Sequence, residues 1–138
     1  MPLNRRKERE TVFIMLFQAG FNGGVDAEAL YNDILTEAES PELFESRYIK
    51  ETFLGSLAHA DESFALIREH AVGWKAERIS RVSIAILKLA IFELLWSPTV
   101  GTSIAINEAV ELSKTYDDEK VSAFINGVLG NIARAKGI

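Results

Sequence analysis

The sequence predicts an all-α protein, and three observations carry that prediction. Apolar residues recur at helical spacing along most of the chain, no segment alternates with a period of two for long, and Gly, Pro, Ser and Asp residues separate the helical patterns. The chain has 138 residues, 48% of them hydrophobic, which suits a single domain with a real core. We expect about seven helices in two small helical subdomains, residues 1–73 and 74–138.

Two helices are expected in the first part of the chain. Asn4 can cap the first helix, which ends near Gly20, and Asp26 can cap the second. The apolar positions of these two helices follow helical spacing: Val12, Phe13, Leu16 and Phe17 in the first, and Leu30, Ile34 and Leu35 in the second.

A longer helix is expected from Ser40-Pro41 to about Val72. Proline is tolerated in the first turn of a helix, and the apolar residues that follow continue at helical spacing. Gly55 lies inside this helix and either bends it or allows a close neighbour. Gly73-Trp74 ends the first half of the chain.

The most apolar helix is expected from Arg81 to Trp96, after a short turn at Lys75 to Ile79 and before Pro98. Its wide apolar surface predicts burial on several sides. It is too short to span a bilayer, which needs about 20 residues, and Lys88 and Glu93 interrupt it. The start of the chain lacks the apolar segment of a secretory signal. We therefore expect a soluble, cytoplasmic protein with no membrane partner.

The last two helices carry polar insertions that core packing does not require. Asn107 and Glu108 interrupt the apolar pattern of one helix, and Asn126-Gly127 interrupts the pattern of the other. A glycine inside a helix costs about 1 kcal/mol relative to alanine, so Gly127 is expected to let another group approach the backbone, most simply a packed helix. Asn107 and Asn126 are expected to hydrogen-bond across the two helices and fix their register.

The first ten residues are basic although the chain as a whole is acidic. Arg5, Arg6, Lys7 and Arg9 stand against two glutamates, a local charge of +2 that leaves −7 for the rest of a chain whose net charge is −5. Cations at the positive end of a helix are mildly destabilising, but the same place favours a bound phosphate. The pattern therefore predicts an anion site. The alternative is a solvated helix end that Glu10 partly neutralises by pairing with Arg6.

Four segments stand out when they are taken together. They are R-R-K-E-R-E (residues 5–10), W-K-A-E-R-I-S-R-V-S-I-A-I-L-K-L-A-I-F-E-L-L (74–95), I-N-E-A-V-E-L-S-K (106–114) and F-I-N-G-V-L (124–129). In this order, and across nearly the whole chain, they resemble the NusB family of bacterial antitermination factors, with the weakest match at residues 21–39. The resemblance implies the same all-α, two-subdomain fold.

The resemblance also implies an RNA surface that binds the boxA sequence of nascent transcripts. The residues that match its basic turn are Arg5, Arg6, Lys7 and Arg9. Phe124 matches an aromatic residue near the RNA and is expected either to stack an unpaired base or to belong to the core. Family members often carry a basic residue before this Phe and an acidic one after the Leu, where this chain has Ala123 and Gly130. Lys120, one turn earlier, is expected to supply the missing charge.

A second partner implied by the resemblance is NusE, a small-subunit ribosomal protein. The matching positions are Phe17, Glu77 and Ser83. With boxA RNA and NusE, the chain is expected to join the RNA polymerase antitermination complex on ribosomal RNA operons. Relatives are found as monomers and dimers, so a homodimer stays open.

The sequence contains few features that are typical of an enzyme. There are no cysteines, no Walker A or G-x-G-x-x-G motif, and His59 and His70 lack metal-site spacing, so we expect no catalytic residue, metal or cofactor. One alternative is an accessory module of a ribosomal-RNA cytosine methyltransferase, but we do not expect a methyl-donor domain within these 138 residues, and they lack the catalytic cysteine of such enzymes. The other is an oligomeric helical scaffold with an incidental basic N-terminus.

Overall fold

A computed structural model describes residues 4–20, 26–97 and 99–138. Within these ranges the chain forms α-helices and two short 3-10 helices (η1 and η2), with no strand. The elements are α1 (Arg5–Ala19), α2 (Ala27–Glu37), η1 (Pro41–Glu45), α3 (Arg47–Ala58), α4 (Ala60–His70), η2 (Ala76–Arg78), α5 (Arg81–Trp96), α6 (Thr102–Tyr116) and α7 (Glu119–Lys136). The prediction of an all-α fold is confirmed.

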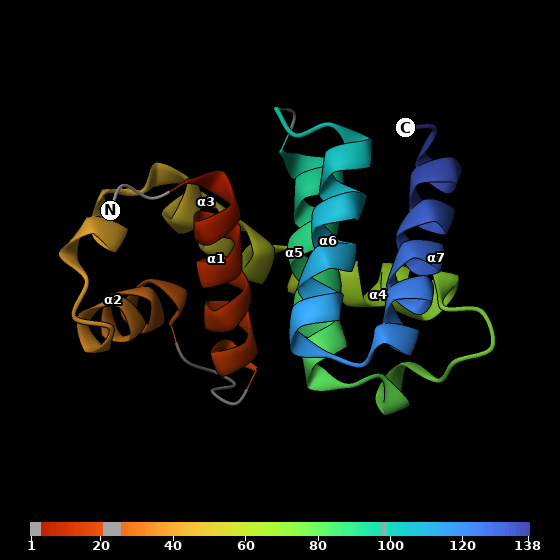
Figure 1. Ribbon diagram of the computed structural model, residues 1–138, viewed down its shortest axis with the longest axis horizontal. Coiled ribbons are helices and arrows are strands. Elements are labelled where there is room, and N and C mark those ends of the chain that lie inside the picture. Colours follow the sequence, from red (N-terminus) through yellow and green to blue (C-terminus); the bar gives the residue numbers. More distant parts are fainter. Residues whose placement is uncertain (1–3, 21–25, 98) are drawn as a thin grey trace.

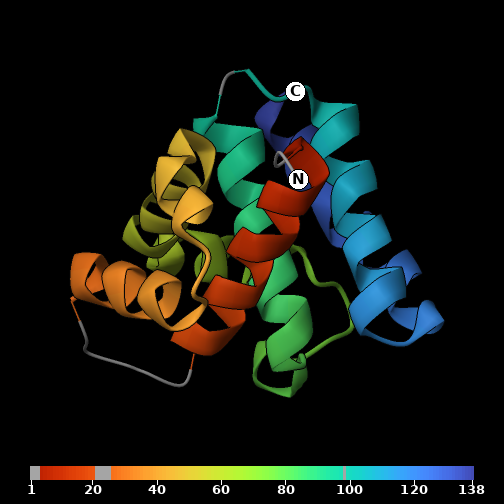
Figure 2. The same cartoon turned by 60° about the vertical axis from the view of Figure 1, so that its left-hand side comes forward.

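Helix α5 is the centre of the molecule. It packs against α1 and α3, against α4, and against α6 and α7. Figure 1 shows α1, α2 and α3 on the left and α6 and α7 on the right, with α5 between them, and Figure 2 shows the same arrangement from a second direction. Burial on both sides explains the wide apolar surface of α5: Ile86, Leu87, Leu89 and Ile91 are at most 1% exposed.

Helices α1 and α2 begin at the side-chain caps that the sequence predicts. The carboxamide oxygen of Asn4 accepts from the backbone N–H of Lys7 (2.8 Å), and the carboxylate of Asp26 accepts from that of Ala29 (3.0 Å). Both N-caps confirm the prediction. Each satisfies a backbone donor that has no partner within its helix, which contributes about 1 kcal/mol.

The expected long helix from residue 40 to residue 72 is wrong, because the chain turns twice within it. Ser46 has an extended backbone, and its hydroxyl caps α3 by accepting from the N–H of Ile49 (3.1 Å). A second break separates α3 from α4 at His59, whose ring stacks on Trp96 of α5 with 3.8 Å between ring centroids. The apolar periodicity continues through both breaks, so it does not mark either of them.

Two helix-interior glycines have opposite surroundings. A Cβ atom on Gly55 would lie 2.2 Å from Cε1 of Phe92, so this glycine allows α3 and α5 to approach each other closely. A Cβ atom on Gly127 would meet nothing within 4 Å. The expectation of a close neighbour is therefore confirmed for Gly55 and wrong for Gly127, because α7 turns Gly127 toward solvent.

Among the described residues, no helix combines the length and the apolar character that a membrane-spanning segment needs.

The two glycines form a matched pair for a stability test. Gly55→Ala is expected to destabilise the protein by about 1–3 kcal/mol, because the added methyl group overlaps the Phe92 ring. Gly127→Ala is expected to stabilise it by up to about 1 kcal/mol, because alanine is the better helix former and the space is empty. Chemical denaturation of both variants measures the two effects. Equal effects in the two variants would contradict this packing of α3 on α5.

Candidate nucleic-acid interface

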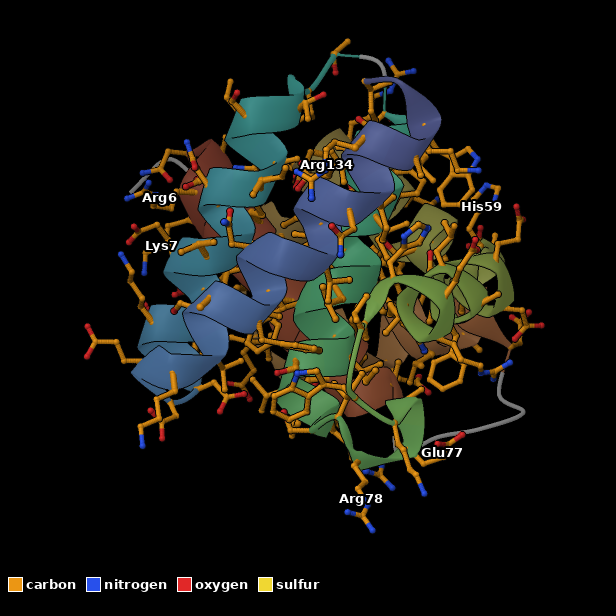
Figure 3. The ribbon with its side chains drawn as sticks, turned by 90° about the vertical axis from the view of Figure 1, so that its right-hand side faces the viewer. Arg6, Lys7, His59, Glu77, Arg78 and Arg134 are labelled. Atoms are coloured by element: carbon orange, nitrogen blue, oxygen red, sulfur yellow. The ribbon has the colours of Figure 1, made fainter. Side chains whose placement is uncertain are left out.

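The first turn of α1 presents three exposed cations. The side chains of Arg5, Arg6 and Lys7 are 56%, 73% and 68% exposed. Figure 3 shows Arg6 and Lys7 projecting from one edge of the molecule. They stand where the backbone N–H groups of a helix start face outward, so the end of α1 combines side-chain and backbone groups that attract an anion.

Each of these cations already has a carboxylate neighbour. Arg5 pairs with Glu8 (3.5 Å) and Lys7 with Glu10 (3.5 Å), both within α1. Arg6 reaches across to α6, where its Nε and Nη2 donate to the two carboxylate oxygens of Glu108 (3.2 and 2.8 Å). The expected pairing of Arg6 with Glu10 is therefore replaced by a contact between two helices, and Lys7 takes Glu10 instead.

Arg9 is not at the surface, which corrects its assignment as an RNA contact. It is 5% exposed, and its guanidinium donates twice to Glu93 of α5 (Nε and Nη2, both 2.9 Å). Its third nitrogen donates to Glu108 (3.1 Å). Burial lowers the pKa of Arg9, but the hydrogen bonds and charge of Glu93 outweigh burial and raise that pKa well above its ordinary value. A guanidinium held in this way cannot face a phosphate.

Tyr48 of α3 completes this buried cluster. Its hydroxyl donates to Glu93 (3.1 Å), so the carboxylate receives hydrogen bonds from α1 and α3 together. Burial and the negative charge of Glu93 raise the pKa of Tyr48 well above its usual range. The guanidinium of Arg5 lies over the Tyr48 ring, 4.2 Å from its centroid. The cluster therefore connects α1, α3 and α5.

Glu108 is the residue that links the buried cluster to the surface. Its carboxylate accepts from the exposed Arg6 and from the buried Arg9 at the same time. The hydrogen bond from Arg6 and the nearby positive charges hold the pKa of Glu108 below its ordinary value, although partial burial opposes this. Glu108 therefore has a structural role that explains its polar position in α6.

The expected hydrogen bond between Asn107 and Asn126 is wrong. Both side chains are exposed, because α6 and α7 pack on the faces opposite to them. The buried polar contact between these helices joins the hydroxyls of Ser113 and Ser122 instead (2.9 Å). Asn107, Asn126 and Gly127 thus lie on the outer face of the α6–α7 pair and are not part of its core.

Phe124 lies at the margin of the core and contacts an aromatic residue that sequence reasoning missed. It is half-buried, and its ring packs against that of Trp74 with 4.9 Å between centroids and 52° between planes. Trp74 is 57% exposed. Lys120, one turn earlier on α7, is exposed as well. The chain therefore carries a partly exposed aromatic pair here, with Trp74 as its exposed member, and a large aromatic residue in a loop was the signal for it.

Comparison with known proteins decides the family. The profile of the NusB family matches residues 6–134. The chain belongs to the NusB family. It is 40% identical to the transcription antitermination protein NusB of Agathobacter rectalis, over 95% of this chain and 100% of that protein. It is 36% identical to the protein of the same name from Bacillus pumilus, over 94% of this chain and 95% of that protein.

Solved NusB structures share this fold. One is T. maritima NusB, with a TM-score of 0.82 and 31% identity, covering 97% of this chain and 93% of that one. Another is in a crystal structure of the antitermination factors NusB and NusE in complex with dsRNA. It has a TM-score of 0.79 and 26% identity, and covers 95% of this chain and 96% of that one.

The three positions assigned to NusE binding lie in different environments. Glu77 is exposed in η2 and projects from the molecule beside Arg78 (Figure 3). Phe17 is half-buried against the core. Ser83 is 3% exposed and its hydroxyl donates to Asp117 (3.2 Å), so its assignment to a NusB-family partner surface is corrected. Ser83 is buried because the N-terminal turn of α5 faces the end of α6.

The lowered pKa of Glu108 predicts a pH-dependent contribution to stability. Because the folded pKa lies below the ordinary value of 4.5, the pairing stabilises the fold fully above that value and is lost as pH falls through the folded pKa. Glu108→Gln is expected to destabilise by about 1 kcal/mol at pH 7. The difference from wild type should shrink below pH 4.5.

Thermal unfolding of both proteins between pH 3 and pH 7 measures this difference. Glu42→Gln is the control, because it removes an exposed carboxylate on η1 that is outside the cluster. A difference between wild type and Glu108→Gln that stays constant across the range would contradict the assignment.

Proposed function

We propose that this chain is an RNA-binding transcription antitermination factor without enzymatic activity. In this proposal it binds boxA RNA of nascent transcripts together with NusE and supports ribosomal RNA transcription in the bacterial cytoplasm. The observation that carries the proposal is the exposed Arg5-Arg6-Lys7 turn at the start of α1, in a chain of the NusB family. A solved relative with 26% identity is a NusB in complex with NusE and dsRNA.

The Arg5-Arg6-Lys7 turn binds phosphates by exchange of ion pairs. The contacts of Arg5 and Lys7 with their glutamates are 3.5 Å long and solvent-exposed on the cation's side, so they contribute little. An RNA phosphate replaces them at small cost and adds the outward N–H groups of the helix start. Arg6 differs, because its bidentate contact with Glu108 fixes the guanidinium in place before RNA arrives.

Phe124 and Trp74 supply the aromatic part of the proposed RNA surface. Single-stranded RNA is recognised by stacking unpaired bases on aromatic rings, and Trp74 offers the larger exposed ring. Lys120 provides a cation on the same helix as Phe124. NusE is proposed to contact Glu77 and Phe17, and the net charge of −5 favours its approach if the contacting surface of NusE is basic.

Removal of two cations tests the RNA surface. The double variant Arg6→Ala/Lys7→Ala is expected to bind a boxA RNA roughly 10- to 100-fold more weakly at 0.1 M salt, because two phosphate contacts are lost. The wild type, with about three contacts, should show a log–log salt slope of about −2 for single-stranded RNA, and the variant a slope nearer −0.7. Fluorescence anisotropy over a salt series measures both quantities.

The matched control is Lys50→Ala/Lys136→Ala, which removes two exposed cations from α3 and α7. Equal losses in the two double variants would show generic charge attraction and contradict the proposed surface.

Repeating the titration with saturating NusE tests the second partner. RNA affinity should rise, and Glu77→Arg should abolish that rise while leaving RNA binding without NusE unchanged. No complex with NusE, even with RNA present, would refute the antitermination role.

A further inference from the structure

A second feature beside the basic turn is a groove between α1, α3 and α5. It has a volume of about 350 Å³, within the range of about 300–1,000 Å³ that is typical of ligand sites. Figure 2 shows the three helices, which pack against one another pairwise. The side chains that line it include two arginines and three aromatic residues: Arg5, Arg47, Tyr48, Phe92 and Trp96.

The two arginines of the groove come from the first turns of two different helices. Arg5 begins α1 and Arg47 begins α3. Arg47 pairs with Glu51 (2.7 Å), but the two side chains are 88% and 61% exposed, so water screens the pair. Glu8, the partner of Arg5, also accepts a hydrogen bond from Ser46, and this second contact holds it at the start of α3. Both guanidinium groups are therefore accessible to a phosphate.

The aromatic side of the groove is held in place from behind. The imidazole of His59 stacks on the indole of Trp96 with 3.8 Å between ring centroids and 9° between ring planes. One face of the indole is thereby covered, and the ring still lines the groove. Tyr48 is fixed by its hydrogen bond to Glu93 and by the Arg5 guanidinium over its ring. Neither ring has to be ordered when a ligand binds.

We propose that this groove binds one nucleotide of a single-stranded RNA, with the phosphate at Arg5 and Arg47 and the base against Trp96. Cations beside an aromatic ring are the combination that recognises a phosphate and an unpaired base together. The groove shares Arg5 with the Arg5-Arg6-Lys7 turn. The proposed RNA path therefore runs from that turn directly into the groove. This inference rests on the proposed RNA-binding function and lengthens its path over α3 and α5.

Glu51 opposes the phosphate in this arrangement and sets its affinity. Its carboxylate lines the groove and holds Arg47. A phosphate must displace it or accept its repulsion, so neutralising Glu51 should tighten RNA binding, whereas removing Arg47 should weaken it. Opposite effects from two residues one helical turn apart are not expected of a change in stability, because both side chains are exposed.

Four variants test the groove by RNA affinity at 0.1 M salt. Arg47→Ala is expected to weaken binding of a boxA RNA about fivefold, and Glu51→Gln to tighten it about twofold. Trp96→Phe, which keeps an apolar ring against His59, is expected to weaken binding about threefold. The matched control is Arg68→Ala. Arg68 is an exposed arginine on α4 that lies over the Phe64 ring (4.9 Å) as Arg5 lies over Tyr48, but it does not line the groove.

Fluorescence of Trp96 gives a readout that is local to the groove. In a Trp74→Phe background, which keeps an aromatic ring against Phe124, single-stranded RNA should quench the remaining tryptophan at an RNA concentration that saturates this variant by anisotropy. Uridine monophosphate is added alone to distinguish an RNA site from a site for free nucleotides. Quenching by RNA and not by the same concentration of mononucleotide supports the inference, and quenching by the mononucleotide alone overturns it.

The outcomes separate the groove from the proposed function. Unchanged affinity in Arg47→Ala and absent quenching, with weakened binding in Arg6→Ala/Lys7→Ala, would overturn the groove and leave the function standing. Equal loss in Arg47→Ala and Arg68→Ala would also overturn it. No RNA binding by the wild type would refute the function itself, and the groove with it.

Discussion

The buried ion pair between Arg9 and Glu93 is the constraint on which the rest of the structure depends. Their side chains are 6% and 1% exposed, so both charges have left water, which is costly unless every polar atom finds a partner. Glu108 and Tyr48 supply the missing partners. The cost of burial is thus offset only when α1, α3, α5 and α6 take their observed positions, and the pair fixes one arrangement of these four helices.

This constraint also decides which cations remain for RNA. Arg9 precedes Val12 and Phe13 by three and four positions, so it lies on the face of α1 that points into the protein. Arg5, Arg6 and Lys7 then stand around the exposed first turn. Glu108 accepts hydrogen bonds from Arg6 at the surface and from Arg9 in the interior, so it fixes the first side chain and helps to neutralise the second. A buried structural pair therefore orients the surface that we propose for RNA.

Periodicity and capping chemistry predicted the helical class, the starts at Asn4 and Asp26, and the burial of the fifth helix, because these depend on local spacing. The apolar spacing did not reveal the break at His59, where the ring contacts Trp96 of a helix far along the chain. The prediction for Arg9 was wrong because a run of charged residues does not show by itself which of them faces the interior. The spacing of Arg9 from Val12 and Phe13, three and four positions, was the indication that it faces inward. The groove joins three helices, so no local pattern contained it.

A double-mutant cycle of Arg9→Met and Glu93→Leu tests the central claim most directly. Each single variant leaves one buried charge unpaired and is expected to lower the free energy of unfolding by about 3–5 kcal/mol. In the double variant no unpaired charge remains, so its loss should be smaller than the sum of the two single losses by about 2 kcal/mol or more. Additive losses would contradict a direct coupling between Arg9 and Glu93, and with it the role of this pair in joining α1 to α5.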